Sequence, residues 1–79
     1  MSIIIKYYAR YRELTGKREE ELQYDFKNIS QVMEALEGKY PKLSKDEGKL
    51  VALNVRYANR DSVVKYGDSI SLFPPVSGG

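Results

Sequence analysis

The sequence contains no cysteine, histidine or tryptophan, and only three prolines among its 79 residues. Without cysteine the chain has no disulfide framework, thiolate nucleophile or zinc ribbon, and without histidine it lacks the commonest general base and metal ligand. The familiar kinds of side-chain catalysis are therefore not expected. The length allows one small domain with a single hydrophobic core.

The charged residues lack a strong bias of sign. Thirteen Lys and Arg face 11 Asp and Glu, the net charge is +2, and nowhere do five or six basic residues run together. This pattern is not typical of nucleic-acid-binding proteins. The apolar run Ile3 to Ile5 is too short for a signal peptide or a membrane span. We expect a cytoplasmic protein with no nucleic-acid or membrane partner, a compartment that the absence of cysteine fits.

Two strands are predicted in the first third of the chain. Apolar residues alternate from Ile3 to Ala9, which indicates a strand with one buried face. Residues 11–15 fit one helical turn ended by Gly16. The alternation from Leu22 to Phe26 predicts a second strand, antiparallel to the first because the connection is too short for a parallel crossover. The acidic run Glu19 to Glu21 is interpreted as a solvated strand start.

One amphipathic helix is predicted from about Gln31 to Tyr40, with Ser30 as its N-cap. Its apolar stripe, spaced by three and four residues, consists of Val32, Met33, Leu36 and Tyr40. Pro41 ends this helix. The polar stretch Lys42 to Lys49 is interpreted as a surface connection that has room for another short turn.

The remaining strands are predicted in the last third of the chain. Leu50 to Val55 is a nearly continuous apolar run, typical of a central strand or one covered on both sides. Asn59 to Asp61 is interpreted as a turn, and Gly67-Asp68 as a hairpin-type turn before the final strand. That strand covers Ser69 to Phe73, and alternation places Phe73 on the face opposite Ile70 and Leu72.

This order of elements predicts an α+β fold of the β-grasp, or ubiquitin-like, type. We expect a mixed sheet of four to five strands, one main helix on one face, and an extended C-terminal tail. The β-grasp domain is assigned to residues 1–73 and the tail to residues 74–79.

The tail is the part of the sequence that points to chemistry. Pro74 and Pro75 cannot donate to a sheet ladder, so the chain should leave the domain in an extended form. Six residues reach roughly 20 Å, and the last two, Gly78 and Gly79, could thread a narrow channel. The chemistry that fits such an accessible carboxylate is ATP-dependent adenylation. A sulfur donor could then displace AMP and leave a thiocarboxylate on Gly79.

Two segments resemble the MoaD-like sulfur carriers of the MoaD/ThiS family. The end of the chain, Gly67 to Gly79, closely resembles the C-terminus of these carriers, and Phe-Pro-Pro-Val-Ser-Gly-Gly at residues 73–79 is its most specific part. Near the start, Tyr7 to Gly16 is similar to the family's aromatic pair followed by Arg-Glu-Leu and glycine. Tyr7 and Tyr8 stand where the family usually has phenylalanines.

The resemblance implies a sulfur-donor subunit of molybdopterin synthase, which is a sulfurtransferase, and no enzyme activity of the chain alone. A ubiquitin-activating-type adenylyltransferase would use ATP and Mg to activate Gly79, and a sulfur donor would then form the thiocarboxylate. The tail would enter the large synthase subunit and give sulfur to cyclic pyranopterin monophosphate, building the molybdopterin dithiolene. The chain itself is expected to bind no metal or other cofactor.

The reacting residues are Gly79 and its neighbour Gly78, and a second group is expected to bind the partners. The expected partner-binding residues are Tyr8, Arg12, Tyr57, Phe73, Pro74, Pro75, Val76 and Ser77. Tyr8, Tyr57 and Phe73 are predicted to form one apolar patch. Two of these residues keep a second interpretation: Tyr57 as ordinary packing under the turn at 59–61, and Arg12 as a solvated charge.

Three other functions are compatible with the same residues. A sulfur carrier of the thiazole or tRNA thiolation type would use the same terminal chemistry. A ubiquitin-like modifier would be joined to target lysines through Gly79. A plain β-grasp binding module would use its apolar face and leave the tail inert.

Overall fold

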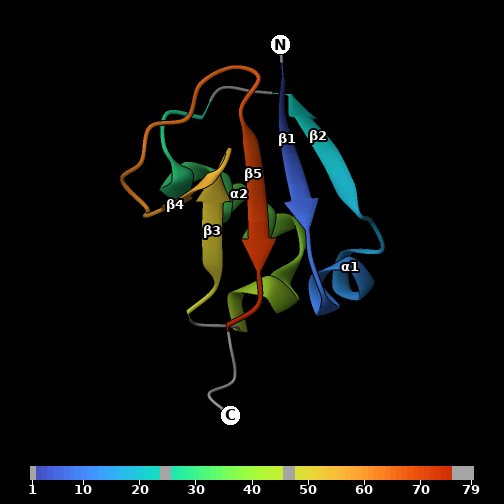
Figure 1. Ribbon diagram of the computed structural model, residues 1–79. Helices are drawn as coiled ribbons and strands as arrows, with labels where there is room; N and C mark the ends of the chain where they lie inside the picture. Colours follow the sequence, from blue (N-terminus) through green and yellow to red (C-terminus); the bar gives the residue numbers. More distant parts are fainter. Residues whose placement is uncertain (1, 24–25, 46–47, 76–79) are drawn as a thin grey trace.

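The computed structural model describes residues 2–23, 26–45 and 48–75. Its elements are β1 (Ser2–Tyr7), α1 (Arg10–Thr15), β2 (Glu19–Gln23), α2 (Ile29–Lys39), the 3-10 helix η1 (Pro41–Lys45), β3 (Leu50–Leu53), β4 (Arg56–Ala58) and β5 (Ser69–Phe73) (Figure 1). The predictions made for Val76, Ser77, Gly78 and Gly79 concern residues outside the described ones.

The five strands form one mixed sheet in the order β2-β1-β5-β3-β4. The central pair, β1 and β5, is parallel, whereas the other three neighbouring pairs are antiparallel. Helix α2 lies across one face of the sheet, and no helix of the described residues covers the other face (Figure 1). The predicted α+β β-grasp fold is confirmed, with five strands and one main helix.

The core lies between α2 and the sheet, as the hydrophobic periodicities predict. The fully buried side chains of the two central strands and the helix are Ile5, Tyr7, Ile70, Leu72, Ile29, Val32 and Leu36. Burying such a side chain contributes about 1.5–3 kcal/mol to the free energy of folding. Gly16 adopts a left-handed conformation and ends α1, which confirms the predicted helical turn.

The start of α2 differs from the prediction. Asn28, not Ser30, is the N-cap, because its Oδ1 accepts a hydrogen bond from the Gln31 backbone N–H at 3.0 Å. The Gln31 side chain in turn accepts from the Lys27 N–H at 2.7 Å. This reciprocal pair resembles a capping box and secures the first turn of the helix.

The connection after α2 is also less exposed than predicted. Pro41 ends the helix and begins η1, and Leu43 within η1 is fully buried in the core. The polar stretch therefore contributes one apolar anchor to the domain.

The hairpin lies at a different place from the one predicted. β3 ends at Leu53 rather than Val55, and the turn at Asn54 and Val55 joins it to β4. Asn54 has a φ of 57°, which asparagine tolerates better than most residues. Gly67, with a φ of 80°, turns the chain into β5, but β5 pairs with β1 and β3 and not with β4. The turn at Gly67 was predicted, whereas Asn54 had been placed inside a strand and the strand pairing was not predicted.

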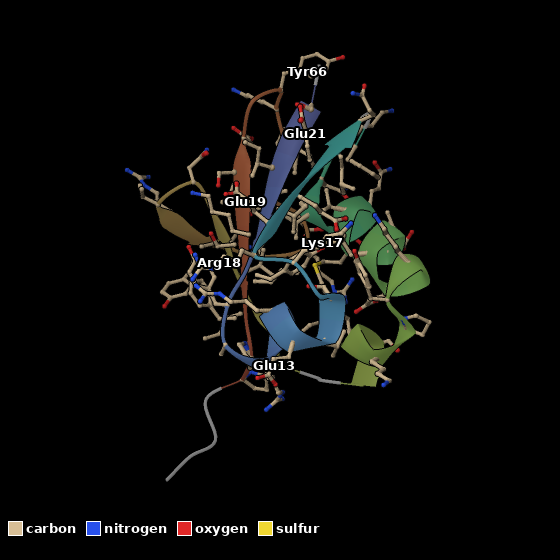
Figure 2. All side chains as sticks on the ribbon, turned by 90° about the vertical axis from the view of Figure 1, so that its right-hand side faces the viewer. Glu13, Lys17, Arg18, Glu19, Glu21 and Tyr66 are labelled. Atoms are coloured by element: carbon tan, nitrogen blue, oxygen red, sulfur yellow. The ribbon has the colours of Figure 1, made fainter. Side chains whose placement is uncertain are left out.

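Glu20 corrects the interpretation of the acidic run as a solvated strand start. Its carboxylate is buried and accepts a hydrogen bond from the Tyr40 hydroxyl at 2.6 Å. Lys39 and Lys17 lie 3.0 and 3.1 Å from its oxygens. Burial alone would raise the pKa of Glu20, but the hydrogen bonds from Tyr40, Lys39 and Lys17 together lower its pKa. Glu19 and Glu21 lie on the outward side of β2 (Figure 2).

Tyr7 lies beside this cluster on the covered face of the sheet. Its ring packs edge-on against Tyr40, with centroids 6.0 Å apart. Its buried hydroxyl has no hydrogen-bond partner among the described residues. Burial, with Glu20 and Tyr40 nearby, raises the pKa of Tyr7 well above its ordinary value, so this tyrosine is neutral.

Candidate functional site

The first residues of the tail, Pro74 and Pro75, follow a central strand of the sheet, and we call this place the tail root. β5 runs between β1 and β3, and its last residue, Phe73, pairs with Leu50. Pro74 follows directly and has no N–H to continue the ladder. Pro75 lies beside Gly48, where an added Cβ would stand 3.7 Å from the Pro75 ring. The chain therefore leaves the sheet at the end of a central strand (Figure 1).

Two aromatic side chains stack at this exit. The rings of Tyr8 and Phe73 are nearly parallel, with an interplanar angle of 13° and centroids 4.6 Å apart. Tyr8 also donates its backbone N–H to the Leu72 carbonyl oxygen at 3.2 Å. The stack couples the end of β1 to the end of β5, one residue before the prolines.

The same stack forms one wall of a hollow of about 310 Å³ on the face of the sheet that has no helix. Ala52 pairs with Tyr57 on one side and Ser71 on the other, so these side chains form a row across the sheet. The residues around the hollow are Tyr8, Ala52, Asn54, Val55, Tyr57, Ser71 and Phe73. The structure thus brings together the three aromatic residues predicted to share a patch, and we call this surface the open-face patch.

Two members of the open-face patch are conspicuously exposed. Tyr57 is 76% exposed, which rules out the interpretation that it packs under the turn at 59–61. Val55 is 95% exposed at the tip of the hairpin, although the sequence pattern assigned it to a covered strand. The asparagine preceding it, a typical turn former, is the signal that could have revealed this.

Asn54 holds the hairpin against β5. Its side-chain oxygen accepts the Ser69 N–H at 3.0 Å, and its own N–H donates to the Ser69 carbonyl oxygen at 2.7 Å. Its amide group also donates to Asp68 at 3.1 Å. These bonds set where Val55 and Tyr57 stand relative to the tail root.

Arg12 contacts the aromatic stack from α1. Its Nε donates to the Tyr7 carbonyl oxygen at 3.1 Å, and its guanidinium carbon lies 5.5 Å from the centre of the Tyr8 ring. A cation over an aromatic face is attractive by about 0.5–1 kcal/mol at an exposed site. Arg12 is therefore anchored beside Tyr8 rather than freely solvated, with its outer nitrogens exposed beside the patch.

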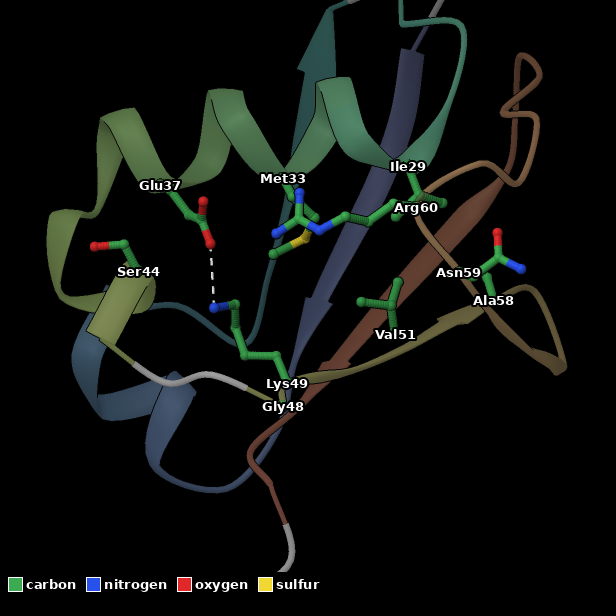
Figure 3. A pocket seen from close by; sticks show the side chains of 10 residues that line it. All are labelled: Ile29, Met33, Glu37, Ser44, Gly48, Lys49, Val51, Ala58, Asn59 and Arg60. Atoms are coloured by element: carbon green, nitrogen blue, oxygen red, sulfur yellow. Dashed lines mark ion pairs between the residues drawn. The ribbon is translucent and has the colours of Figure 1, made fainter.

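A second hollow, of about 540 Å³, lies on the helix side between α2, β3 and β4 (Figure 3). Its apolar lining includes Met33 and Val51. Within it, the Lys49 ammonium pairs with Glu37 at 3.1 Å and donates to the Leu43 carbonyl oxygen at 2.8 Å. Sequence analysis did not predict this hollow, and its buried lysine already has its charge matched.

Among the described residues, the lining of the open-face patch is aromatic, aliphatic or uncharged polar. A surface of this composition is suited to contact with a partner protein. Within residues 2–23, 26–45 and 48–75 no group of acidic side chains is arranged to hold a metal ion. Over the same residues, no helix is long and apolar enough to cross a membrane.

The fold and the patch define a small β-grasp domain whose last strand ends in two prolines beside a surface of exposed and stacked aromatic side chains. The model of the ThiS family matches residues 5–79. The molybdopterin synthase sulfur carrier subunit of Haemophilus influenzae is 41% identical over 78 residues, which cover 95% of this chain and 96% of that protein. The chain therefore belongs to the MoaD/ThiS family of sulfur carriers, as the two sequence segments indicated.

Solved structures agree with this assignment. The crystal structure of SAMP1 from Haloferax volcanii matches with a TM-score of 0.84 and 29% identity, over 100% of both chains. The solution structure of small archaeal modifier protein 1 from Methanosarcina acetivorans matches with a TM-score of 0.83 and 26% identity, over 99% of this chain and 96% of that one. Similar structures thus include proteins named as modifiers.

Proposed function

We propose that the chain is the sulfur-carrying small subunit of a cytoplasmic molybdopterin synthase, with Gly79 as the residue that carries sulfur. The observation that carries this proposal is the 41% identity to a molybdopterin synthase sulfur carrier subunit over nearly the whole of both chains. The geometry of the tail root supports it, because a central strand ends in two prolines beside an exposed aromatic patch.

In the proposed cycle, the Gly79 carboxylate is activated first. A carboxylate oxygen attacks the α-phosphorus of ATP, held with Mg by a ubiquitin-activating-type adenylyltransferase, and pyrophosphate leaves. A donor of sulfur at the oxidation level of sulfide then attacks the carbonyl carbon of the acyl-adenylate. The C–O bond to AMP breaks and a C-terminal thiocarboxylate forms.

In the second half of the cycle, the thiocarboxylate sulfur attacks an oxygen-bearing carbon of cyclic pyranopterin monophosphate in the large subunit. The new C–S bond replaces a C–O bond of that carbon, whose oxygen leaves as water or as the opened phosphate ester. Water then hydrolyses the resulting thioester, leaving the sulfur on the pterin and returning the Gly79 carboxylate. Two such transfers supply the two sulfurs of the dithiolene. We assign the acid and base groups to the large subunit, because the described residues that line the open-face patch include no acidic or lysine side chain.

The chain's own residues act by binding in this proposal. Tyr8, Tyr57 and Phe73 would bury their exposed ring surface against a partner, and aromatic residues are favoured in such contacts. Arg12 would offer its outer nitrogens to a partner carboxylate. Residues 74–77 would line the entry of the partner's channel.

The test is reconstitution with the adenylyltransferase, ATP, a sulfur donor, the large subunit and cyclic pyranopterin monophosphate. We expect an intact-mass gain of about 16 Da on Gly79, from sulfur replacing oxygen, followed by molybdopterin formation. A chain lacking Gly78 and Gly79 should show neither, with its thermal transition unchanged because two terminal glycines have no side chains to bury. Molybdopterin formed by the truncated chain would overturn the proposal.

A second candidate function is a ubiquitin-like modifier joined to target lysines through the activated Gly79. The similarity to small archaeal modifier protein 1 favours it specifically. Peptide mass spectrometry of the host cell distinguishes the two roles. Target lysines branched with the C-terminal glycines of this chain would support the modifier, and a thiocarboxylate without conjugates would support the carrier alone.

A further inference from the structure

The end of the domain opposite the tail root carries a second, distinct apolar surface. A hollow of about 580 Å³ opens between the start of α2 and the loop that precedes β5. Val63 is 63% exposed and Tyr66 is 60% exposed at its edge, with Phe26 and Ile3 within it. We call this surface the far-end hollow. Figure 2 shows Tyr66 at the end of the molecule away from the tail.

The walls of the far-end hollow are fixed by backbone hydrogen bonds. The Val64 N–H donates to the Lys27 carbonyl oxygen at 3.0 Å, and the Ile29 N–H donates to that of Ser62 at 3.0 Å. The loop is also tied to β1, because the Gly67 N–H donates to the Ser2 carbonyl oxygen at 3.0 Å. Val63 is therefore held towards solvent by a bonded framework, and the hollow exists before any ligand arrives.

The charged side chains among the described residues that line the hollow are both lysines. Lys27 and Lys65 both line the hollow, and neither ammonium group has a carboxylate partner among the described residues. Asp68, the nearest acid along the loop, already accepts the Lys65 backbone N–H at 2.7 Å and the Asn54 amide at 3.1 Å. An apolar hollow with two unmatched cations suits an apolar group flanked by carboxylates.

We propose that the far-end hollow is a docking site for a partner-protein segment that places one bulky apolar side chain between acidic residues. The five residues of β5, roughly 16 Å of strand, separate the hollow from the exit of the tail. A segment bound there leaves the open-face patch and the tail free. The domain can thus be held by one protein while its tail is engaged by another, a role that does not depend on sulfur chemistry at Gly79.

The test is amide chemical-shift mapping on the full-length ¹⁵N-labelled chain. The probes are decapeptides with a central Leu, Phe or Trp flanked on each side by two Asp, and a matched set flanked by Lys. We expect saturable shifts at residues 26–27 and 63–66 with at least one Asp-flanked peptide, bound at least about tenfold more tightly than its Lys-flanked counterpart. Equal binding of the two sets, or no saturable shift with any Asp-flanked peptide, would overturn the proposal.

Two variants locate the site. Val63→Ser combined with Lys65→Glu changes only exposed side chains, so the fold should persist, and we expect at least about tenfold weaker binding. Val55→Ser removes another exposed valine, from the open-face patch, and should leave peptide affinity unchanged. Shifts centred on Tyr8, Tyr57 and Phe73 would refute the assignment to this end. So would shifts induced by phosphatidylserine vesicles but by no peptide, or shifts that change on dilution of the protein alone, because they would indicate a membrane or a second copy.

Discussion

The two faces of the sheet use neighbouring tyrosines in opposite ways. Tyr7 points under α2, is fully buried and packs edge-on against Tyr40. Tyr8 lies on the face without a helix, where it stacks on Phe73 beside the exposed ring of Tyr57. Burial of side chains on the covered face thus stabilises the fold, whereas the aromatic side chains on the open face remain available for contact with a partner. The same residue type serves either purpose, depending only on which side of the strand end it occupies.

The largest expected effect comes from breaking the covered face. Leu36→Ala removes a fully buried side chain of α2 and leaves a cavity against the sheet. We expect the free energy of unfolding to fall by about 2–5 kcal/mol. Urea denaturation followed by circular dichroism measures this. A loss below about 1 kcal/mol would show that α2 contributes less to the core than its burial indicates.

The matching change on the open face should affect binding instead of folding. Phe73→Ala removes half of the stack with Tyr8, and we expect affinity for the large subunit to fall by about 10- to 100-fold. The midpoint of denaturation should move much less than in Leu36→Ala. Titration calorimetry with the large subunit tests this, and unchanged affinity would return Phe73 to a purely structural role.

The buried carboxylate of Glu20 makes the stability of the covered face depend on pH. Folding lowers the pKa of Glu20 from its ordinary value of 4.5. As the pH falls below 4.5, the unfolded chain therefore binds more protons than the folded chain. The stabilisation is therefore complete above about pH 5 and is lost as the pH drops through the folded-state pKa. Glu20→Gln should cost about 1–2 kcal/mol at pH 7 and flatten the loss of stability on acidification.

Glu19→Gln is the control for this prediction, because Glu19 lies on the same strand with its side chain exposed (Figure 2). Denaturation midpoints measured from pH 7 to pH 3 compare the two variants. Parallel curves for wild type and Glu20→Gln would contradict a stabilising role of the buried carboxylate.

The smallest effect has the opposite sign. Tyr7→Phe removes a buried hydroxyl that has no partner among the described residues, so we expect a gain of about 1 kcal/mol in the free energy of unfolding. Tyr8→Phe should change stability by less than about 0.5 kcal/mol because Tyr8 lies outside the core. Thermal denaturation of the pair measures both. Destabilisation by Tyr7→Phe would reveal a hydrogen bond made by that hydroxyl.

Local periodicity predicted the parts of the fold that depend on nearest neighbours. The alternation in β1 and the stripe of α2 each identified buried faces correctly, and Gly16 marked the end of α1. Candidate caps were harder to separate, since Asn28 and Ser30 are both good N-cap residues and only the geometry of the preceding loop decides between them.

Pairings between distant segments could not be predicted from such patterns. Gly67-Asp68 has hairpin-type composition, yet β5 enters the middle of the sheet because β1 offers it a free edge. The partners of the buried Glu20 come from two separate places, Lys17 just before β2 and Lys39 and Tyr40 at the end of α2, and no local pattern shows this convergence. For the open-face patch, the alternation of side chains along the strands indicated that Phe73 and Tyr8 share the face opposite the core. The contribution of Val55 could not be predicted, because it depends on the position of the turn between β3 and β4.

The parallel pairing of β1 with β5 has a consequence for the order of events during synthesis. Ile4 pairs with Ser69 and Tyr7 with Leu72, so the first strand made has no central partner until the last one leaves the ribosome. The Tyr8–Phe73 stack joins the same two ends. An enzyme that recognises this stack would therefore bind only a chain in which β5 has been made and has paired with β1. A chain that stops before Phe73 lacks the stack.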